Sequence, residues 1–527
     1  MTSKTLLRLY AEHTGKVSEK WYLYLNEFDR LFDEYREKSM SLLEIGVQNG
    51  GSLEIWSKYF SNSEALIGCD INPDCARLRY EDSRINVIVG DANSPDIREQ
   101  ITRLTPQFDI IIDDGSHRSS DIIKTFSTYF PLLADGGIFI VEDIHCNYWE
   151  SFEGGLFDPF SAITFFKRLS DIINYEHWVT PEVRADNLRG FFWKYNCKMD
   201  DNVLSRVHSV EFINSLCVIR KASVAEEIGD SKYKRLLDKY RDEPIRLLEI
   251  GMQNGSSLEI WSKYFSQALM LIGCDINPDC AQLSYDDPRI DVIVGDANRL
   301  DVCEQIIRRT PQFDIIIDNG SHRSSDIIKT FSSYFPLLAD GGIFIINDIH
   351  LSYGESFERA VHDPFSAVTF LNRLIDIINY DHWGVTRVRS DILRSIFLKY
   401  NCHIDDEVLS RVHSVEFINS LCVVRKALST DNSLGRLIIA GDLEPVTTGL
   451  IQTHGVDTYS DTYLLDQTFN PWTRLALAEE ELACTKLVFE DAEQQLKQIT
   501  SSRSWKLTLP LRQVMRWITK RSNDIRK

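Results

Sequence analysis

Residues 41–52 read SLLEIGVQNGGS, an apolar run that ends in a glycine-rich turn, and residues 246–257 repeat the pattern as RLLEIGMQNGSS. Both stretches belong to a larger duplication, because residues 41–222 align with residues 246–427 without a gap and 135 of the 182 aligned pairs are identical. We call the two halves copy one and copy two. Against so similar a background, the few positions that differ become informative. A chain of 527 residues has material for two core-forming domains of about 200 residues each.

Each copy alternates short Ile- and Val-rich runs with helical stretches, which is typical of a parallel sheet covered on both faces. In copy one, strands are predicted at residues 41–46, 65–70, 85–90, 108–113 and 137–142, and helices at residues 53–60, 120–133 and 161–177. Residues 207–212 and 216–221 are predicted to form an antiparallel hairpin at the sheet edge. The fold class is therefore α/β, with two tandem doubly wound, Rossmann-like domains, and ligands bind such sheets beyond the carboxyl ends of the strands.

Composition excludes several classes of protein. A formal net charge of −20 argues against nucleic acid as a partner, because neutralising phosphates requires clustered Lys and Arg. The eleven cysteines include no CxxC spacing, which favours reduced thiols in a cytoplasmic protein. We find no apolar run long enough for a signal peptide or a membrane span.

Polar motifs follow the first three predicted strands of copy one. The first contains Glu44, Gly46 and Gly50, with a G-x-x-x-G-G spacing that differs from the G-x-G-x-x-G of dinucleotide-binding folds. Asp70 ends the second strand, where a carboxylate can accept hydrogen bonds from ribose hydroxyls, and Asp91 follows the third, within reach of a purine edge. Each feature alone is often only structural, as a turn or a helix cap. In this order they predict a nucleoside site.

Two acidic clusters follow the fourth and fifth predicted strands. Residues 113–117 read DDGSH and residues 142–145 read EDIH, whereas copy two reads DNGSH at 318–322 and NDIH at 347–350. Carboxylate oxygens at the tips of adjacent strands suit a hard cation. The pattern predicts one working cation site in copy one and a degenerate one in copy two. In the plainer alternative, these carboxylates cap loops and the histidine hydrogen-bonds to them.

With these motifs, copy one resembles the class I S-adenosyl-L-methionine (SAM)-dependent methyltransferases. DDGSH at 113–117, FPLLADGG at 130–137 and the Glu142-Asp143 pair are similar to the metal-dependent sugar O-methyltransferases of the macrocin and mycinamicin type. The resemblance implies a sugar or glycan acceptor, and a Mg²⁺ ion held by Asp114, Glu142 and Asp143 with His117 as general base. It implies SAM contacts from Glu44, Gly46, Gly50, Asp70 and Asp91, and in copy two from Glu249, Gly251, Asp275 and Asp296. Residues 12–32, present before copy one only, resemble a cap near the methyl donor.

The repeat ends near residue 428, so we divide the chain into domains at 1–222 and 223–428, a linker or small irregular element at 429–471, and a tail at 472–527. Leu475, Leu482, Phe489 and Leu496 recur every seven residues. Residues 475–499 are therefore predicted to form a coiled coil, within an oligomer or with a partner such as a glycosyltransferase. The alternative is a helix packed on the body of the protein. The basic, amphipathic residues 503–527 suit either an anionic membrane surface or an acidic protein surface. Residues 504–512 resemble a segment that trails many bacterial surface-polysaccharide enzymes.

Together these features predict a SAM- and Mg²⁺-dependent O-methyltransferase that acts on a sugar hydroxyl in bacterial polysaccharide or lipopolysaccharide biosynthesis, with copy two as an inactive pseudoenzyme domain. The expected location is the cytoplasm, with peripheral contact at the inner face of the cytoplasmic membrane. Two alternatives stay open. One is a non-catalytic SAM-binding scaffold of a glycan assembly complex, and the other is a nicotinamide-dependent sugar oxidoreductase, which the missing G-x-G-x-x-G disfavours.

Overall fold

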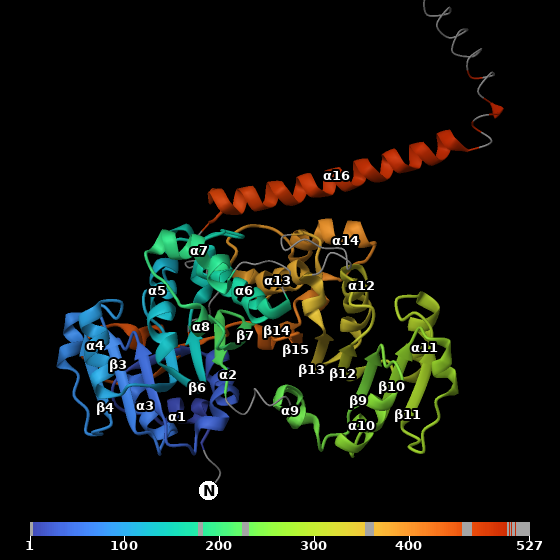
Figure 1. Ribbon diagram of the computed structural model, residues 1–527. Helices are drawn as coiled ribbons and strands as arrows, with labels where there is room; N and C mark the ends of the chain where they lie inside the picture. Colours follow the sequence, from blue (N-terminus) through green and yellow to red (C-terminus); the bar gives the residue numbers. More distant parts are fainter. Residues whose placement is uncertain are drawn as a thin grey trace, which may run out of the picture.

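A single fourteen-stranded sheet runs through both copies (Figure 1). The structure is a computed structural model that describes residues 4–177, 183–223, 231–353, 363–455 and 466–502, together with residues 505, 507, 508 and 512. In Figure 1, copy one lies on the left and copy two on the right.

Copy one has the predicted doubly wound sheet. Its parallel strands are β2 (Ser41–Ile45), β3 (Ala65–Asp70), β4 (Ile85–Val89), β5 (Phe108–Asp113) and β6 (Leu133–Val141). They lie in the order β4-β3-β2-β5-β6, followed by antiparallel β8 (Leu216–Lys221) and then β7 (Val207–Ile213). The helices are α3 (Gly51–Tyr59), α4 (Pro95–Leu104), α5 (Ser119–Tyr129), α6 (Ala162–Ile173), α7 (Arg184–Tyr195) and α8 (Asp201–Leu204). Both faces of the central strands are covered, since Ile110, Ile111 and Ile112 of β5 are all fully buried.

Copy two repeats the plan. Its strands are β9 (Arg246–Ile250), β10 (Met270–Asp275), β11 (Ile290–Val294), β12 (Phe313–Asp318), β13 (Leu338–Asn347), β14 (Val412–Ile418) and β15 (Leu421–Lys426). Its helices are α9 (Ser231–Leu237), α10 (Ser256–Tyr264), α11 (Leu300–Arg309), α12 (Ser324–Tyr334), α13 (Ala367–Ile378), α14 (Arg394–Tyr400) and α15 (Asp406–Leu409).

The hairpin predicted at the edge of each sheet is present, but its outer strand is not a free edge. β7 and β14 pair antiparallel, and Glu211 lies opposite its own equivalent, Glu416. A pseudo-twofold axis therefore passes between these residues. Although burial alone would raise the pKa of the Glu211 carboxyl, Arg30 (3.1 Å) and Arg425 (2.8 Å) hold it below its ordinary range. Pairing of buried charges makes this strand contact possible.

The segment after the repeat, predicted as a linker or small element, returns to copy one. The N-terminal region forms α1 (Leu6–Glu12), β1 (Ser18–Trp21) and α2 (Tyr22–Phe32), and β1 pairs antiparallel with β16 (Leu437–Ala440). Asn49, in the turn after β2, accepts hydrogen bonds from the amides of Val446 (2.8 Å) and Thr447 (2.9 Å) and donates to the Thr447 carbonyl (2.8 Å). We call residues 429–453 the return segment.

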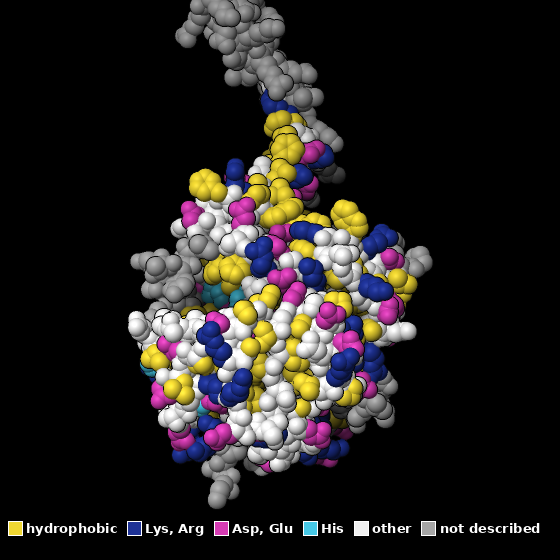
Figure 2. Space-filling model, turned by 90° about the vertical axis from the view of Figure 1, so that its left-hand side faces the viewer, with side chains coloured by type: hydrophobic (Ala, Val, Ile, Leu, Met, Phe, Trp, Pro, Cys, Tyr) yellow, Lys and Arg dark blue, Asp and Glu magenta, His cyan; other side chains and the backbone are white. Residues whose placement is uncertain are grey.

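The long helix α16 (Pro471–Ser501) crosses over both copies (Figure 1). The first half of α16 packs against the body of the protein through its buried residues, Thr473, Ala476, Glu480 and Cys484. The predicted heptad residues lie on another face and are exposed: Leu475, Leu482, Phe489 and Leu496. Figure 2 shows hydrophobic side chains in a row along the protruding part of this helix.

Among the residues described, none of the helices is both long and apolar enough to cross a bilayer. The predicted amphipathic stretch at 503–527 falls outside the described residues, apart from four positions.

Candidate functional site

A cavity of about 710 Å³ lies beyond the carboxyl ends of the copy-one strands. It is lined by most of the site residues predicted for copy one: Gly46, Asp70, Asp91, Asp114, His117, Glu142 and Asp143. Residues of β1, copy two and the return segment complete its wall. The sequence motifs of copy one therefore converge on one space.

The glycine turn after β2 is shaped by close backbone contacts. Gly46 has φ +91°, and a Cβ atom there would lie 2.0 Å from the carbonyl oxygen of Asp114, so only glycine fits. Asp70 accepts hydrogen bonds from the amides of Val47 (2.9 Å) and Gln48 (2.8 Å). Asp70 therefore fixes the turn in addition to lining the cavity. Asp91 lines the cavity one strand further along.

Two of the predicted SAM contacts, Glu44 and Gly50, do not line the cavity. Glu44 is 1% exposed and accepts a hydrogen bond from the Ser52 hydroxyl (2.7 Å) beneath the turn. Burial raises its pKa to about 7. Gly50 has φ +78°, and a Cβ atom there would lie 2.0 Å from the Tyr80 hydroxyl oxygen. In this structure both residues support the shape of the turn from behind.

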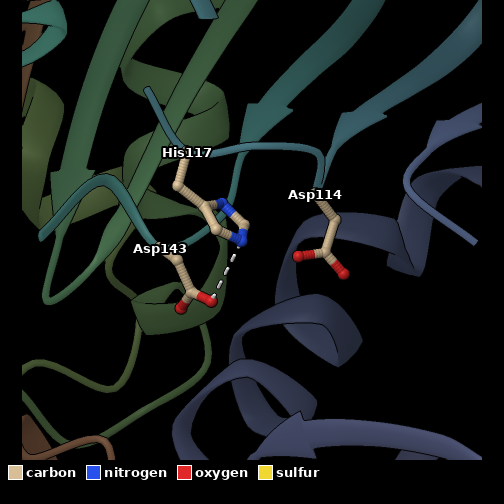
Figure 3. A group of neighbouring side chains, drawn as sticks. All are labelled: Asp114, His117 and Asp143. Atoms are coloured by element: carbon tan, nitrogen blue, oxygen red, sulfur yellow. Dashed lines mark ion pairs between the residues drawn. The ribbon is translucent and has the colours of Figure 1, made fainter. Parts of the chain in front are cut away.

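Asp114, His117 and Asp143 form the candidate cation site. One ligand atom from each lies within 4.8 Å of the others, and Figure 3 shows the His117 ring between the two carboxylates. His117 Nε2 is 3.8 Å from Asp143 Oδ2. His117 (φ +57°) and Asp143 (φ +51°) both adopt the left-handed backbone conformation, which is costly for non-glycine residues and clusters at functional sites.

Glu142, the third predicted ligand, turns toward Lys20 of β1. Its Oε2 atom is 2.8 Å from Lys20 Nζ, and its buried Oε1 atom has no hydrogen-bond partner among the described residues. Lys20 also pairs with Asp114. Burial and the Asp114 charge raise the pKa of Glu142 well above its ordinary value, although Lys20 opposes this. The acidic cluster therefore contains the buried ammonium group of Lys20, which none of the sequence motifs predicted.

Tyr24 of α2 positions Asp143. Its hydroxyl donates to Asp143 Oδ1 (2.6 Å) and lies 2.6 Å from Ser215 Oγ in the β7–β8 turn. Lys20 and Tyr24 both belong to the segment that precedes copy one only, and this uniqueness was the one sequence signal for their role.

Copy two keeps the shape of the turn. Gly251 has φ +82°, and Asp275 accepts a hydrogen bond from the Gln253 amide (2.7 Å). Asp296 accepts from the Asn298 amide (2.9 Å), and Glu249 is hydrogen-bonded beneath the turn to a serine hydroxyl (2.7 Å), as Glu44 is in copy one.

The acidic cluster of copy two has two amides, Asn319 and Asn347, at the positions of Asp114 and Glu142. Asn319 donates to the Gly251 carbonyl (3.3 Å), and Asn347 accepts from the Tyr233 hydroxyl (2.8 Å). Both amides therefore make internal hydrogen bonds where copy one has carboxylates. The copy-two equivalents of residues 149–157 lie outside the described residues.

Known proteins that are similar to this chain are methyltransferases. A protein family described as a methyltransferase domain matches residues 43–144. The 8-demethyl-8-α-L-rhamnosyl tetracenomycin-C 2′-O-methyltransferase of Streptomyces olivaceus is 32% identical over 171 residues, 31% of this chain and 44% of that protein. The demethylmacrocin O-methyltransferase of Streptomyces fradiae is 33% identical over 180 residues, 32% of this chain and 44% of that protein.

The mycinamicin VI 2″-O-methyltransferase of Micromonospora griseorubida is 34% identical over 160 residues, 28% of this chain and 39% of that protein. Among solved structures, the MycE methyltransferase in complex with Mg and SAH is 23% identical, with a TM-score of 0.34, over 42% of this chain and 54% of that one. The chain spans less than half the length of these curated relatives. The predicted resemblance to macrocin- and mycinamicin-type sugar O-methyltransferases is confirmed, and the predicted doubly wound α/β fold is present in both copies.

Proposed function

We propose that the protein is a SAM-dependent O-methyltransferase whose working site is in copy one and whose acceptor is a sugar hydroxyl. The observation that carries this proposal is the convergence, in one cavity, of the glycine turn after β2 and the acid–histidine cluster after β5 and β6. The relatives named above are sugar O-methyltransferases, which supports the same acceptor class.

The residues present fit SAM. Gly46 lines the cavity at the turn, where its backbone packs against that of Asp114, and Asp70 holds the amides of Val47 and Gln48 in place. The cavity extends from this turn to the acidic cluster. It can therefore take a nucleoside at one end and an acceptor hydroxyl at the other.

The residues also fit Mg²⁺. Asp114, Glu142 and Asp143 would hold it, because they supply oxygen ligands on adjacent strand ends and Glu142 has an unpartnered buried oxygen. When bound, Mg²⁺ lowers the pKa of a hydroxyl that it contacts. Lys20 bridges two of these carboxylates and limits their mutual repulsion.

His117 is the proposed general base. Its ring lies beside Asp143, which Tyr24 orients, so the imidazole is held at the acidic cluster. The acceptor oxygen gives its proton to His117 and forms a bond to the methyl carbon, while the carbon–sulfur bond breaks and its electron pair stays on sulfur. Holding donor and acceptor in one cavity supplies much of the acceleration, because the reaction becomes effectively unimolecular.

We propose that copy two does not catalyse the transfer, because Asn319 and Asn347 replace two carboxylates and are engaged in internal hydrogen bonds. We further propose that the acceptor belongs to a bacterial polysaccharide or lipopolysaccharide, supported by the tail resemblance at residues 504–512. The exposed heptad residues of α16 support a helical partner, either another copy of this chain or a glycosyltransferase.

The test is transfer of labelled methyl from SAM into the glycan fraction of the source cells. We expect label with the native protein, and none with EDTA or with Asp114→Asn combined with Glu142→Asn. In copy two, Asn319 and Asn347 already stand at the equivalents of these two positions, so the copy-two control is Asp348→Asn at the equivalent of Asp143, and it should leave incorporation intact. Loss of label with Asp348→Asn and not with the copy-one variant would assign the chemistry to copy two, and an unchanged rate in EDTA would contradict the metal requirement.

A further inference from the structure

Copy two contributes residues to the copy-one cavity. Asp381 and His382 line it, although both belong to η13 (Tyr380–His382), the turn that follows α13 in copy two. Helices α6 and α13 each pack on both β7 and β14, so the two copies interlock at this point (Figure 1). The wall of the cavity is therefore incomplete in copy one alone.

Three contacts fix η13 against copy one. The His382 ring lies 4.2 Å from the His145 ring, centroid to centroid, and its Nε2 is 3.0 Å from Asn214 Oδ1. The Trp149 indole N–H donates to the His382 carbonyl (2.9 Å). Because His382 is 4% exposed, it is a packed part of the wall, and it holds its neighbour Asp381 at the cavity.

This wall adjoins the reacting end of the cavity. His145 Nδ1 lies 3.8 Å from Asp143 Oδ1, so the contacts run from the acidic cluster through His145 to His382 and Asp381. The Asp381 side chain is 28% exposed, and its ion pair with Arg389 is long, at 3.5 Å. A carboxylate oxygen is thus available to a ligand. Aromatic faces beside a carboxylate suit a sugar ring and its hydroxyls.

We propose that Asp381 of copy two binds a hydroxyl of the acceptor sugar and helps to determine which acceptor is methylated in copy one. The inference rests on the proposed function and extends it, because it assigns the degenerate copy a binding role in the working site. Trp149, His145 and His382 form the wall on which the sugar ring lies.

The pseudo-twofold axis provides the matched control. The equivalent of Asp381 is Glu176, and the rings of His177 and His350 repeat the histidine contact at 3.8 Å beside the copy-two site. Glu176 accepts a hydrogen bond from the Asn419 side chain (2.6 Å). The contact between histidine rings therefore occurs twice, but only in copy one does it adjoin a complete set of carboxylates.

The experiment compares the native chain, Asp381→Asn and Glu176→Gln. Methyl transfer is measured at increasing concentrations of the glycan fraction, and the dissociation constant for S-adenosylhomocysteine is measured by calorimetry. We expect Asp381→Asn to raise the half-saturating acceptor concentration about tenfold to a hundredfold, as for loss of a hydrogen bond to a charged group. Nucleoside affinity and melting temperature should stay unchanged, and Glu176→Gln should match the native chain.

The outcomes separate the inference from the proposed function. Equal half-saturation for Asp381→Asn and the native chain would overturn the role of Asp381 and leave methyl transfer in place. An equal rise with Glu176→Gln would also overturn it, because the effect would then not be specific to the copy-one site. Absence of any transfer by the native chain would refute the proposed function itself.

Discussion

Asp376 of α13 joins the two copies through one buried carboxylate. Its Oδ1 atom lies 2.5 Å from Lys167 Nζ and accepts a hydrogen bond from the Tyr148 hydroxyl (2.9 Å), and the two charged side chains are 2% and 12% exposed. At an effective dielectric constant of about 20, this separation corresponds to about 7 kcal/mol of attraction, much of which desolvation offsets. Asp376→Asn keeps the shape but leaves Lys167 buried without its counter-charge. We expect it to lower the free energy of unfolding by about 3–5 kcal/mol.

The assay is urea unfolding followed by tryptophan fluorescence. Asp171 is the copy-one equivalent of Asp376, and the copy-two equivalent of Lys167 is Asn372. Asp171→Asn is therefore the matched change, and it should lower the free energy of unfolding by less, because the equivalent of Lys167 is an uncharged amide. Adding Lys167→Met to Asp376→Asn removes the unpaired charge and should recover part of the loss. Equal losses for Asp376→Asn and Asp171→Asn, or no recovery in the double variant, would show that the unpaired ammonium is not the cause.

Three further predictions concern the turn after β2, the return segment and copy two. Gly46→Ala places a methyl group 2.0 Å from the Asp114 carbonyl at φ +91°, so calorimetry should show more than about tenfold weaker nucleoside binding. Asn49→Ala removes the hydrogen bonds to residues 446–447; limited proteolysis should then cut the return segment faster, and unchanged cleavage would contradict its anchoring role. Burial raises the pKa of Asp318 from 3.8 to about 7, so the stability from its protonated form is present at low pH and lost as pH rises toward 7. Asp318→Asn should therefore gain stability relative to the native chain by up to about 3 kcal/mol between pH 5 and pH 8, whereas a pH-independent difference in chemical denaturation would contradict this.

Much of the fold follows from local sequence. The strands at β3 and β5 have the predicted bounds, because each is a short apolar run that ends in an aspartate. The helix predicted at 120–133 ends early, at Tyr129, because Pro131 lies in a 3-10 turn, η3 (Phe130–Leu132), that leads directly into β6.

The site was only partly predictable. The carboxylates at residues 114, 142 and 143 could be recognised because strand ends bring them together. Lys20, Tyr24 and Asp381 reach the same cavity through contacts between segments far apart in the chain. No local periodicity encodes such contacts, so the structure was needed to find them.

The pairing of β1 with β16 also affects how the protein is made. Ser18 pairs with Ala440, so during synthesis β1 waits for a strand that lies about 420 residues further along the chain. At about 5–20 residues per second, that wait lasts some tens of seconds, and pairing over such a separation is intrinsically slow. Because the return segment also lines the cavity, a nascent or prematurely terminated chain contains the acidic cluster but not the finished wall. Synthesis of the return segment thus becomes a condition for a complete site.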